Sequence, residues 1–203
     1  MQNQRTSRLH LLTESAIMIA LATVLSMIKV YQAPYGGSIT LLSMAPLIVL
    51  AMRRGTKVGL AAAFVRSLIC LLLGFSDVMW VPTVGGIVLC ILFDYIFAFT
   101  VLGLGGIFRN VHFSDNETTN LIIASVLGAL VATGLRFLCH VISGAVIWYA
   151  LDLEWYADDP GHIVHRYGAW MFSLIYNGAY MLPEMIETCI GVPLLTKALS
   201  KVK

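Results

Sequence analysis

The sequence predicts an all-α membrane protein, a bundle of six transmembrane helices that forms a single integral-membrane domain over residues 1–203. Composition is the first reason, because 59% of the residues are hydrophobic and only 12% are charged, whereas charged residues make up about a quarter of an ordinary soluble domain. The second reason is that six apolar segments approach the length of about 20 residues that a bilayer-spanning helix needs. The third is the distribution of lysine and arginine, which gather in alternate connections between these segments.

The six predicted helices follow from the apolar segments, taken in chain order. They cover residues 11–30, 39–52, 58–74, 81–108, 121–150 and 169–195. The second segment is short for a bilayer, so we expect the preceding residues 33–38 to dip into the membrane. Pro183 and Pro193 are expected to kink the last segment, because proline lacks a backbone donor. The first segment has no convincing small-residue cleavage site, so we expect it to be retained and not removed as a signal peptide.

Lysine and arginine beside the segment ends predict that both termini are cytoplasmic. With the N-terminus inside, nine of these residues flank the inner ends of the helices: Arg5, Arg8, Arg53, Arg54, Lys57, Arg109, Lys197, Lys201 and Lys203. Only Lys29 and Arg166 flank the outer ends. In this topology the long connection over residues 149–168 lies outside and is acidic. A chain with six membrane helices also has the lipid bilayer as a predicted partner.

The sequence carries no motif that indicates catalysis, a metal site or nucleic-acid binding. It lacks the G-x-x-x-x-G-K-[ST] phosphate loop, the H-E-x-x-H helix and the G-x-S-x-G elbow. Its net charge is only +2, without a basic tract, and its four cysteines lie inside apolar segments, where they are interpreted as packing residues. His162 and His165 lack a third ligand for a metal. We therefore predict no catalytic residue, no cofactor, no metal site and no nucleic-acid partner.

Ionisable side chains inside the apolar segments are the strongest functional signal. Arg136 and His140 lie one helical turn apart near the middle of one segment, and Asp94 lies inside another. Each charge costs about 2.5–3.5 kcal/mol at the centre of a membrane helix and usually faces a binding site or an ion path. A structural polar clamp between helices is the alternative. Asp94 must be paired with a cation, for which Arg66 is available, or protonated, or kept for a ligand.

The neighbouring polar and aromatic residues have the chemistry of a ligand pocket. His140, Ser143, Gly144 and Trp148 are three to five residues apart and share one broad helix face. Trp148 would either belong to an interfacial aromatic belt or stack on a flat heterocycle. Together these groups suit a flat cationic or amino-heterocyclic ligand. The predicted contacts are Asp94, Tyr95, His140, Trp148, Tyr176 and Asn177.

Two carboxylates in the last segment have a different interpretation. Glu184 and Glu187 lie one turn apart near Pro183. We expect them to satisfy Arg136 or Arg66, because a hydrolytic pair would need its partner groups on facing helices.

Five stretches of the chain together carry a resemblance to a known family. They read LLTESAIMIALA at 11–22, GGSITLLSMAPLIVLAMRRG at 36–55, DYIFAFTVLGLGGIFR at 94–109, RFLCHVISGAVIW at 136–148 and FSLIYNGAYMLPE at 172–184. The chain resembles the thiamine-specific substrate-binding (S) components of energy-coupling factor transporters, the ThiT or YuaJ family. The resemblance implies a six-helix bundle in the prokaryotic plasma membrane that captures thiamine from outside. It also implies docking on a membrane coupling subunit (EcfT-like) that carries two ATPase subunits.

The same resemblance assigns roles to individual residues. The carboxylate–tyrosine pair that contacts the ligand in the family falls on Asp94 and Tyr95, its histidine on His140, its stacking tryptophan on Trp148 and its asparagine on Asn177. The small residues that contact the coupling subunit fall on Ala16 and Ala20. Small residues four apart also let helices approach closely in general, so ordinary packing inside the bundle is the alternative for this pair.

Three other functions stay open at the level of sequence. The ligand of such a component could be a thiamine precursor, such as the aminopyrimidine half, or a related heterocycle. The chain could instead be a structural membrane protein whose polar residues only pin helices together. An intramembrane enzyme using Asp94 or Glu184 would differ from both by turning over a substrate without any partner.

Overall fold

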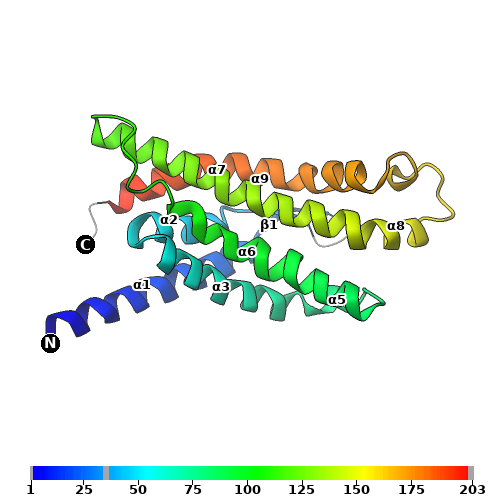
Figure 1. The fold of residues 1–203 in the computed structure, drawn as a ribbon, viewed down its shortest axis with the longest axis horizontal. Helices are drawn as coiled ribbons and strands as arrows, with labels where there is room; N and C mark the ends of the chain where they lie inside the picture. Colours follow the sequence, from blue (N-terminus) through cyan, green and yellow to red (C-terminus); the bar gives the residue numbers. More distant parts are fainter. Residues whose placement is uncertain (1, 34–36, 201–203) are drawn as a thin grey trace.

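The computed structural model describes residues 2–33 and 37–200, and in these residues long helices run along one common direction (Figure 1). The longest are α1 (Gln2–Met27), α3 (Thr56–Leu73), α7 (Glu117–Ser143) and α9 (Ala169–Leu199). α7 and α9 pack against each other along much of their length. The start of α1 and the end of α9 lie at one end of the molecule, and the connection between α8 and α9 lies at the other.

The remaining helices are shorter and mostly continue one another. Between α3 and α7 the chain forms α4 (Phe75–Val78), α5 (Val84–Cys90), the π-helix η1 (Ile91–Ile96), α6 (Phe97–Thr100) and the 3-10 helix η2 (Val101–Gly106). Beyond α7 follow the π-helix η3 (Gly144–Trp148), α8 (Tyr149–Trp155) and the 3-10 helix η4 (Ile163–His165). The chain therefore runs from α5 to η2, and again from α7 to α8, as one helical stretch with local changes of pitch.

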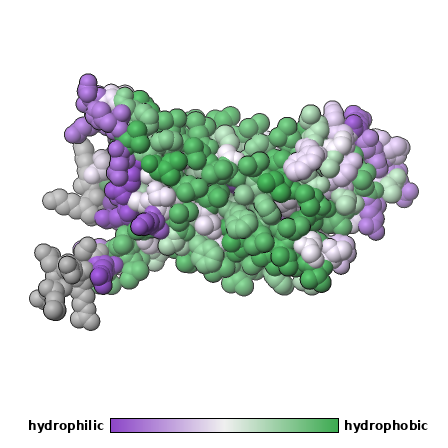
Figure 2. Space-filling model, in the orientation of Figure 1, coloured by the Kyte–Doolittle hydropathy of each residue, from purple (hydrophilic) through white to green (hydrophobic). Residues whose placement is uncertain are grey.

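On the face shown in Figure 2, hydrophobic residues cover the middle of the molecule, and hydrophilic residues gather at both ends. Four helical stretches are long and apolar enough to cross a membrane: Arg8–Met27, Thr56–Leu73, Val84–Gly106 and Glu117–Trp155. This arrangement agrees with the predicted all-α membrane fold. α9 also runs unbroken from Ala169 to Leu199, through both Pro183 and Pro193.

The structure corrects the first two predicted helices. α1 ends at Met27, and the next residues form a two-stranded antiparallel hairpin of β1 (Lys29–Gln32) and β2 (Ser38–Thr40). The second helix, α2, covers only Ala45–Arg54 and has Pro46 in its first turn. The expectation that residues 33–38 dip into the membrane falls partly on residues 34–36, outside the described residues.

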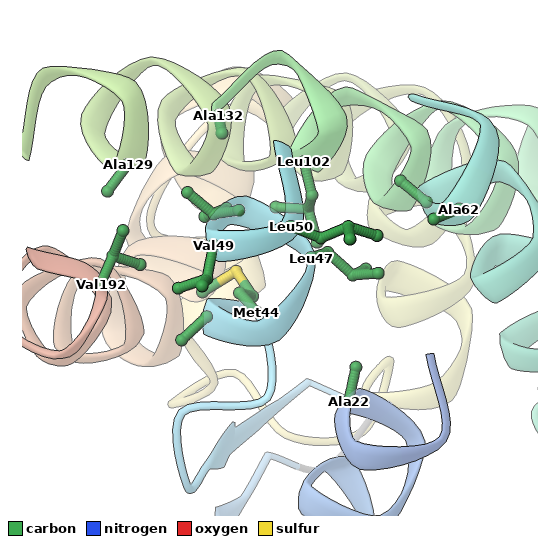
Figure 3. Close-up of a cluster of buried hydrophobic side chains, with 13 residues drawn as sticks. Ala22, Met44, Leu47, Val49, Leu50, Ala62, Leu102, Ala129, Ala132 and Val192 are labelled. Atoms are coloured by element: carbon green, nitrogen blue, oxygen red, sulfur yellow. The ribbon is translucent and has the colours of Figure 1, made fainter. Parts of the chain in front are cut away.

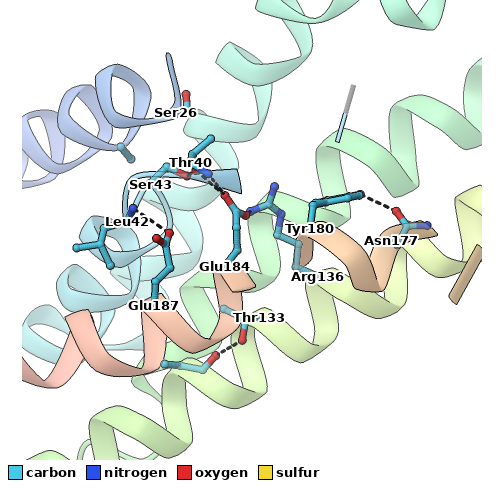
Figure 4. Close-up of polar contacts among 12 residues, drawn as sticks. Ser26, Thr40, Leu42, Ser43, Thr133, Arg136, Asn177, Tyr180, Glu184 and Glu187 are labelled. Atoms are coloured by element: carbon cyan, nitrogen blue, oxygen red, sulfur yellow. Dashed lines mark hydrogen bonds and ion pairs between the residues drawn. The ribbon is translucent and has the colours of Figure 1, made fainter. Parts of the chain in front are cut away.

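The second helix starts late because side chains of α9 hold the backbone before it in place (Figure 4). The Thr40 amide and hydroxyl both donate to Glu184 Oε1, at 2.8 and 2.5 Å. The Leu42 amide donates to Glu187 Oε1 at 2.9 Å. Backbone donors that are satisfied by carboxylates need no helical partner. The strand therefore runs to Thr40, and residues 41–44 form bends and a turn before α2 begins.

The predicted outer connection over residues 149–168 is also wrong in its first part. Residues Tyr149–Trp155 form α8, and Asp152 within it is fully buried. Leu151 and Ile147 pack in an apolar cluster with Val78, Val81 and Cys90. This burial of apolar area favours continuing the helix by about two turns, and the non-helical connection begins only at Tyr156.

The main core surrounds α2, which is buried on all sides from Ala45 to Met52 (Figure 3). Its side chains pack against Ala22 of α1, Ala62 of α3, Leu102 of η2, Ala132 of α7 and Val192 of α9. A ten-residue helix is too short to cross a bilayer of about 30 Å. α2 is therefore a short, buried helix at the centre of the bundle. The hairpin and a cavity occupy the space beyond its N-terminus.

Candidate functional site

A cavity of about 590 Å³ lies in the half of the bundle that contains the hairpin, the end of α3 and the start of α9. This volume lies within the range of sites for small organic molecules. All six ligand contacts predicted from the sequence line it: Asp94, Tyr95, His140, Trp148, Tyr176 and Asn177. Residues that are far apart in the sequence, on η1, α7, η3 and α9, are thus brought to one site.

Asp94 is the centre of the polar wall of this cavity. Its Oδ1 lies 3.1 Å from His140 Nδ1, while its Oδ2 accepts from Ser143 Oγ at 2.5 Å and from Trp148 Nε1 at 2.9 Å. The Asp94 side chain is only 15% exposed. The Ser143 hydroxyl and the Trp148 indole both donate to this carboxylate, which holds it in place, so Asp94 brings an anionic group to the cavity wall.

The two π-helices position these groups. Asp94 lies in η1, and Trp148 ends η3. In a regular α-helix a separation of eight positions, as from His140 to Trp148, would leave the two side chains about 80° apart. One extra residue in a π turn removes about 100° of that rotation, so both side chains face Asp94.

Gly144, at the start of η3, lets this part of the helix approach α9. A Cβ atom at Gly144 would lie 2.2 Å from Ser173 Oγ and 2.9 Å from Asn177 Nδ2. Any side chain here would push the two helices apart and widen the cavity.

His140, which lines the cavity, has a second ring nitrogen that is not used by the described part of the protein. Because an ionised Asp94 can only accept, His140 Nδ1 carries the proton of their hydrogen bond. His140 Nε2 is buried and has no hydrogen-bond partner among the described residues. A buried nitrogen without a partner is costly, and a ligand that donates a hydrogen bond would satisfy it.

Aromatic rings form much of the remaining wall. The Tyr95 hydroxyl donates to the Gly74 carbonyl at 2.8 Å, which fixes the ring at the end of α3. Tyr176 stacks on Phe172 with ring centroids 6.1 Å apart and planes 21° apart, and both line the cavity. Such faces suit a flat ring with a positive charge.

Asn177 lines the cavity, but its side-chain amide already forms hydrogen bonds within the protein. Nδ2 donates to the His140 carbonyl at 3.2 Å and to the Ser173 carbonyl at 3.0 Å, and Oδ1 accepts from the Tyr180 hydroxyl at 2.5 Å. Asn177 thus ties α9 to α7 beside His140. Its direct contact with a ligand stays a prediction.

The inner end of the cavity contains Arg66 and Arg136. Arg136 Nη1 lies 3.3 Å from Glu184 Oε2 (Figure 4), which confirms that Glu184 satisfies Arg136. Arg66 does not pair with Asp94: its guanidinium contacts Cys70 Sγ and donates to Ser26 Oγ at 2.8 Å. Arg66 was a candidate partner of Asp94 because it lies on the preceding apolar segment. In the structure the Asp94 carboxylate contacts His140, Ser143 and Trp148 instead.

Two carboxylates of the cavity wall were not predicted as contacts. Asp77, in the short helix α4, and Asp152, in α8, both line the cavity. Asp152 follows Trp148 by four residues, the spacing of one helical face. That signal was present in the sequence, but the residue was assigned to an exposed connection.

The predicted docking residues Ala16 and Ala20 lie elsewhere. Both are exposed on α1, one turn apart on the same face, and α1 extends toward the end of the molecule that carries the termini (Figure 1). Among the described residues no group of three or more His, Cys, Asp or Glu side chains could hold a metal ion. His165 Nε2 instead lies 2.7 Å from the Tyr156 carbonyl oxygen.

Comparisons with known proteins agree on one family. The sequence profile described as "Thiamine transporter protein (Thia_YuaJ)" matches residues 12–203. The chain is 30% identical over 196 residues to "Thiamine transporter ThiT" of Bacillus subtilis, an alignment that covers 94% of this chain and 92% of that protein. It is 28% identical over 200 residues to "Thiamine transporter ThiT" of Lacticaseibacillus paracasei, covering 95% and 89% of the two chains. A solved structure of ThiT from Listeria monocytogenes superposes with a TM-score of 0.73 at 26% identity and covers 96% of this chain and 97% of that one.

Proposed function

We propose, since this chain belongs to the thiamine transporter protein family Thia_YuaJ, that it captures thiamine from outside the cell and delivers it for uptake across the plasma membrane. The relatives are named as transporters, which is a non-enzymatic role, and the chain is not an enzyme. The observation that carries the proposal is the Asp94 carboxylate, which His140, Ser143 and Trp148 contact in the wall of the cavity.

The chemistry of thiamine fits this cavity group by group. Its thiazolium ring is a flat cation and its aminopyrimidine ring carries an exocyclic amino group. We assign Asp94 to oppose the cation or to accept from the amino group. We assign His140 Nε2, which carries no proton, to accept from an N–H of the amino group at the heteroatom edge. Tyr95, Trp148 and Tyr176 would enclose the rings. Asn177 would act here through its bonds to His140 and Tyr180 or through a direct contact.

The topology that goes with this role has six membrane helices in one domain over residues 1–203, with both termini in the cytoplasm of a prokaryotic cell. Four apolar spans support part of that count, and α9 and the short α2 with its hairpin would supply the other two. Arg53 and Arg54 pair with Glu14 of α1, and Arg53 also donates to the Leu199 carbonyl at the end of α9. Arg166 instead lies in the connection between α8 and α9, at the other end of the molecule (Figure 1). This distribution supports a cytoplasmic position for the termini, with the cavity opening outward.

Transport also needs a source of energy. This chain has no phosphate loop at which it could hydrolyse ATP, so we expect the energy to come from a partner. We propose an energy-coupling factor arrangement, in which a membrane coupling subunit with two ATPase subunits docks on α1. The exposed Ala16 and Ala20 support this surface, since small residues let a partner helix approach closely.

Titration of the purified protein with thiamine by isothermal calorimetry tests the proposal directly. We expect saturable binding to one site, and weaker binding of the isolated aminopyrimidine half, which lacks the cation. Tighter binding of the aminopyrimidine would identify a precursor as the ligand. The absence of binding by thiamine, its phosphates and its halves would leave a structural role for the polar residues.

Substitution of Trp148 tests the aromatic wall. Trp148→Ala should weaken thiamine binding by roughly 1–3 kcal/mol if the ring stacks on the ligand, as for base–aromatic stacking. Trp148→Phe keeps a ring but loses the indole N–H that donates to Asp94, so it should recover only part of the affinity. Calorimetry on both variants and on Trp170→Ala, an exposed tryptophan near the start of α9, separates stacking from interfacial anchoring. Equal affinity in all of them would assign Trp148 to the aromatic belt.

Enlarging the small residues of α1 tests the docking surface. Ala16→Trp and Ala20→Trp should bind thiamine as the parent does, yet fail to support uptake in vesicles that contain the coupling subunit and its ATPases. Ala61→Trp, a matched control on the exposed face of α3, should support uptake normally. Normal uptake by the two α1 variants would contradict the docking assignment, and lost binding would mean that these alanines pack inside the bundle.

A further inference from the structure

Two buried arginines at the inner end of the cavity have no part in the proposed contacts with thiamine. Arg66 is 3% exposed and Arg136 is 9% exposed, and both line the cavity. Their guanidinium carbons lie 5.5 and 4.5 Å from the centroid of the same Phe99 ring. A site for a cationic ligand therefore contains two cations of its own, held next to each other.

Arg66 carries the larger imbalance of charge. Its donors meet Cys70 Sγ, Ser26 Oγ and, at 3.5 Å, the Ala22 carbonyl. Its Nε has no hydrogen-bond partner among the described residues, and the ion pairs of the described residues include none with Arg66. A guanidinium buried this deeply is ordinarily paired with an anion.

Arg136 is compensated only in part. Its one ion pair among the described residues is with Glu184, at 3.3 Å, and the same carboxylate also accepts twice from Thr40. The Nε atom of Arg136 is buried without a hydrogen-bond partner. Glu184 is thus shared between Arg136 and the hairpin and forms no ion pair with Arg66, so the two guanidinium groups together keep a net positive charge and unused donors.

We propose that Arg66 and Arg136 form an anion-binding subsite at the inner end of this cavity, which takes a small anion such as chloride or inorganic phosphate. The planar guanidinium group matches phosphoryl oxygens with two parallel N–H groups. The anion comes either from solution or from a phosphate ester carried by the ligand itself, since the chemistry of recognition is shared.

This inference rests on the proposed function for its consequence, which is that thiamine binding depends on the anion. A thiazolium cation that enters the cavity without an anion meets the positive field of Arg66 at low dielectric. An anion at the subsite removes that repulsion, so each ligand favours the other through a reciprocal coupling.

The first measurement needs no thiamine. Protein purified in detergent is melted in sodium gluconate with increasing sodium chloride or inorganic phosphate at constant ionic strength. An anion bound to the folded state raises Tm with its concentration, and Arg66→Gln should abolish the rise. Arg66→Lys keeps the charge without the planar fork and should retain part of it. Lys29→Gln removes a positive charge from the hairpin side of the same cavity and should keep the full rise.

The second measurement is a thiamine titration of the same proteins in chloride and in gluconate. The parent should bind about tenfold more weakly in gluconate, roughly 1.4 kcal/mol, while Arg66→Gln should bind equally in both salts. Thiamine monophosphate identifies the source of the anion. If its ester occupies the subsite, its affinity should be indifferent to chloride and should fall more in Arg66→Gln than that of thiamine.

The outcomes separate this inference from the proposed function. Two results together would overturn the anion subsite. The parent would have the same Tm and the same affinity for thiamine in all salts, and Arg66→Gln and Arg66→Lys would bind thiamine and its monophosphate in the parental ratio. A parent that binds no thiamine in any salt would contradict the proposed function, while a chloride-dependent Tm would still support the subsite.

Discussion

Asparagine in place of Asp94 is expected to weaken thiamine binding by roughly 1.5–3 kcal/mol, the contribution of a hydrogen bond to a charged group. The substitution keeps the size of the side chain and removes its charge. It also turns an amide nitrogen toward one of the donors that now surround the carboxylate, His140, Ser143 or Trp148. Calorimetric titration of the purified protein measures the loss.

Asp77→Asn is the matched control, because it removes another carboxylate from the wall of the same cavity. Among the described residues the side chain of Asp77 accepts only from its neighbour Ser76, at 3.3 Å. We expect a clearly smaller effect on affinity. Equal losses in the two variants would mean that only the total charge of the cavity matters, and parental affinity in Asp94→Asn would restrict Asp94 to joining η1 with α7 and η3.

Alanine in place of Glu184 is expected to lower the free energy of unfolding by roughly 3–5 kcal/mol, because it leaves a buried charge without its partner. Glu184 is 1% exposed and connects three elements through its carboxylate: α9 itself, α7 through Arg136, and the hairpin through Thr40. Thermal or denaturant unfolding in detergent measures the change. The hairpin should also become more accessible to protease.

Two further variants show where this energy comes from. Glu187→Ala removes a half-buried carboxylate with one hydrogen bond, to the Leu42 amide, and should cost only about 1 kcal/mol. The double variant Arg136→Met with Glu184→Leu replaces the buried pair by apolar groups and should recover much of the loss from Glu184→Ala. A double variant as unstable as Glu184→Ala alone would mean that the bonds to Thr40, and not the ion pair, hold the fold together.

The membrane helices were predictable where hydrophobicity alone determines them. The third segment was expected over residues 58–74 and is observed as Thr56–Leu73, because nothing but apolar length sets its boundaries. The start of the second helix was not predictable in this way. Residues 39–44 are as apolar as the residues of a membrane helix. Their backbone amides, however, donate to carboxylates that lie more than 140 positions later in the chain.

The candidate site shows the same division. The sequence indicated that Asp94, His140 and Trp148 belong together, since each is a polar or aromatic group in an apolar run. It could not indicate that Trp148 donates to Asp94, because this depends on the π turn that rotates the two side chains of the helix into line. Hydropathy and α-helical periodicity carry no information on such a turn.

The helix from Glu117 to Trp155 has 39 residues, which corresponds to about 58 Å at the rise of an α-helix. The hydrocarbon layer of a membrane is about 30 Å thick, so close to half of this helix must stand outside it or be accommodated by tilt. If the surplus is shared between the two ends, Trp148 and Asp152 lie at the level of the lipid headgroups. A ligand would then exchange its hydration water for protein contacts in steps, first beside the hydrated headgroups and only later at the depth of Arg136. Bilayer thickness thereby becomes a variable of ligand capture, and lipids with shorter chains should leave more of the cavity in water.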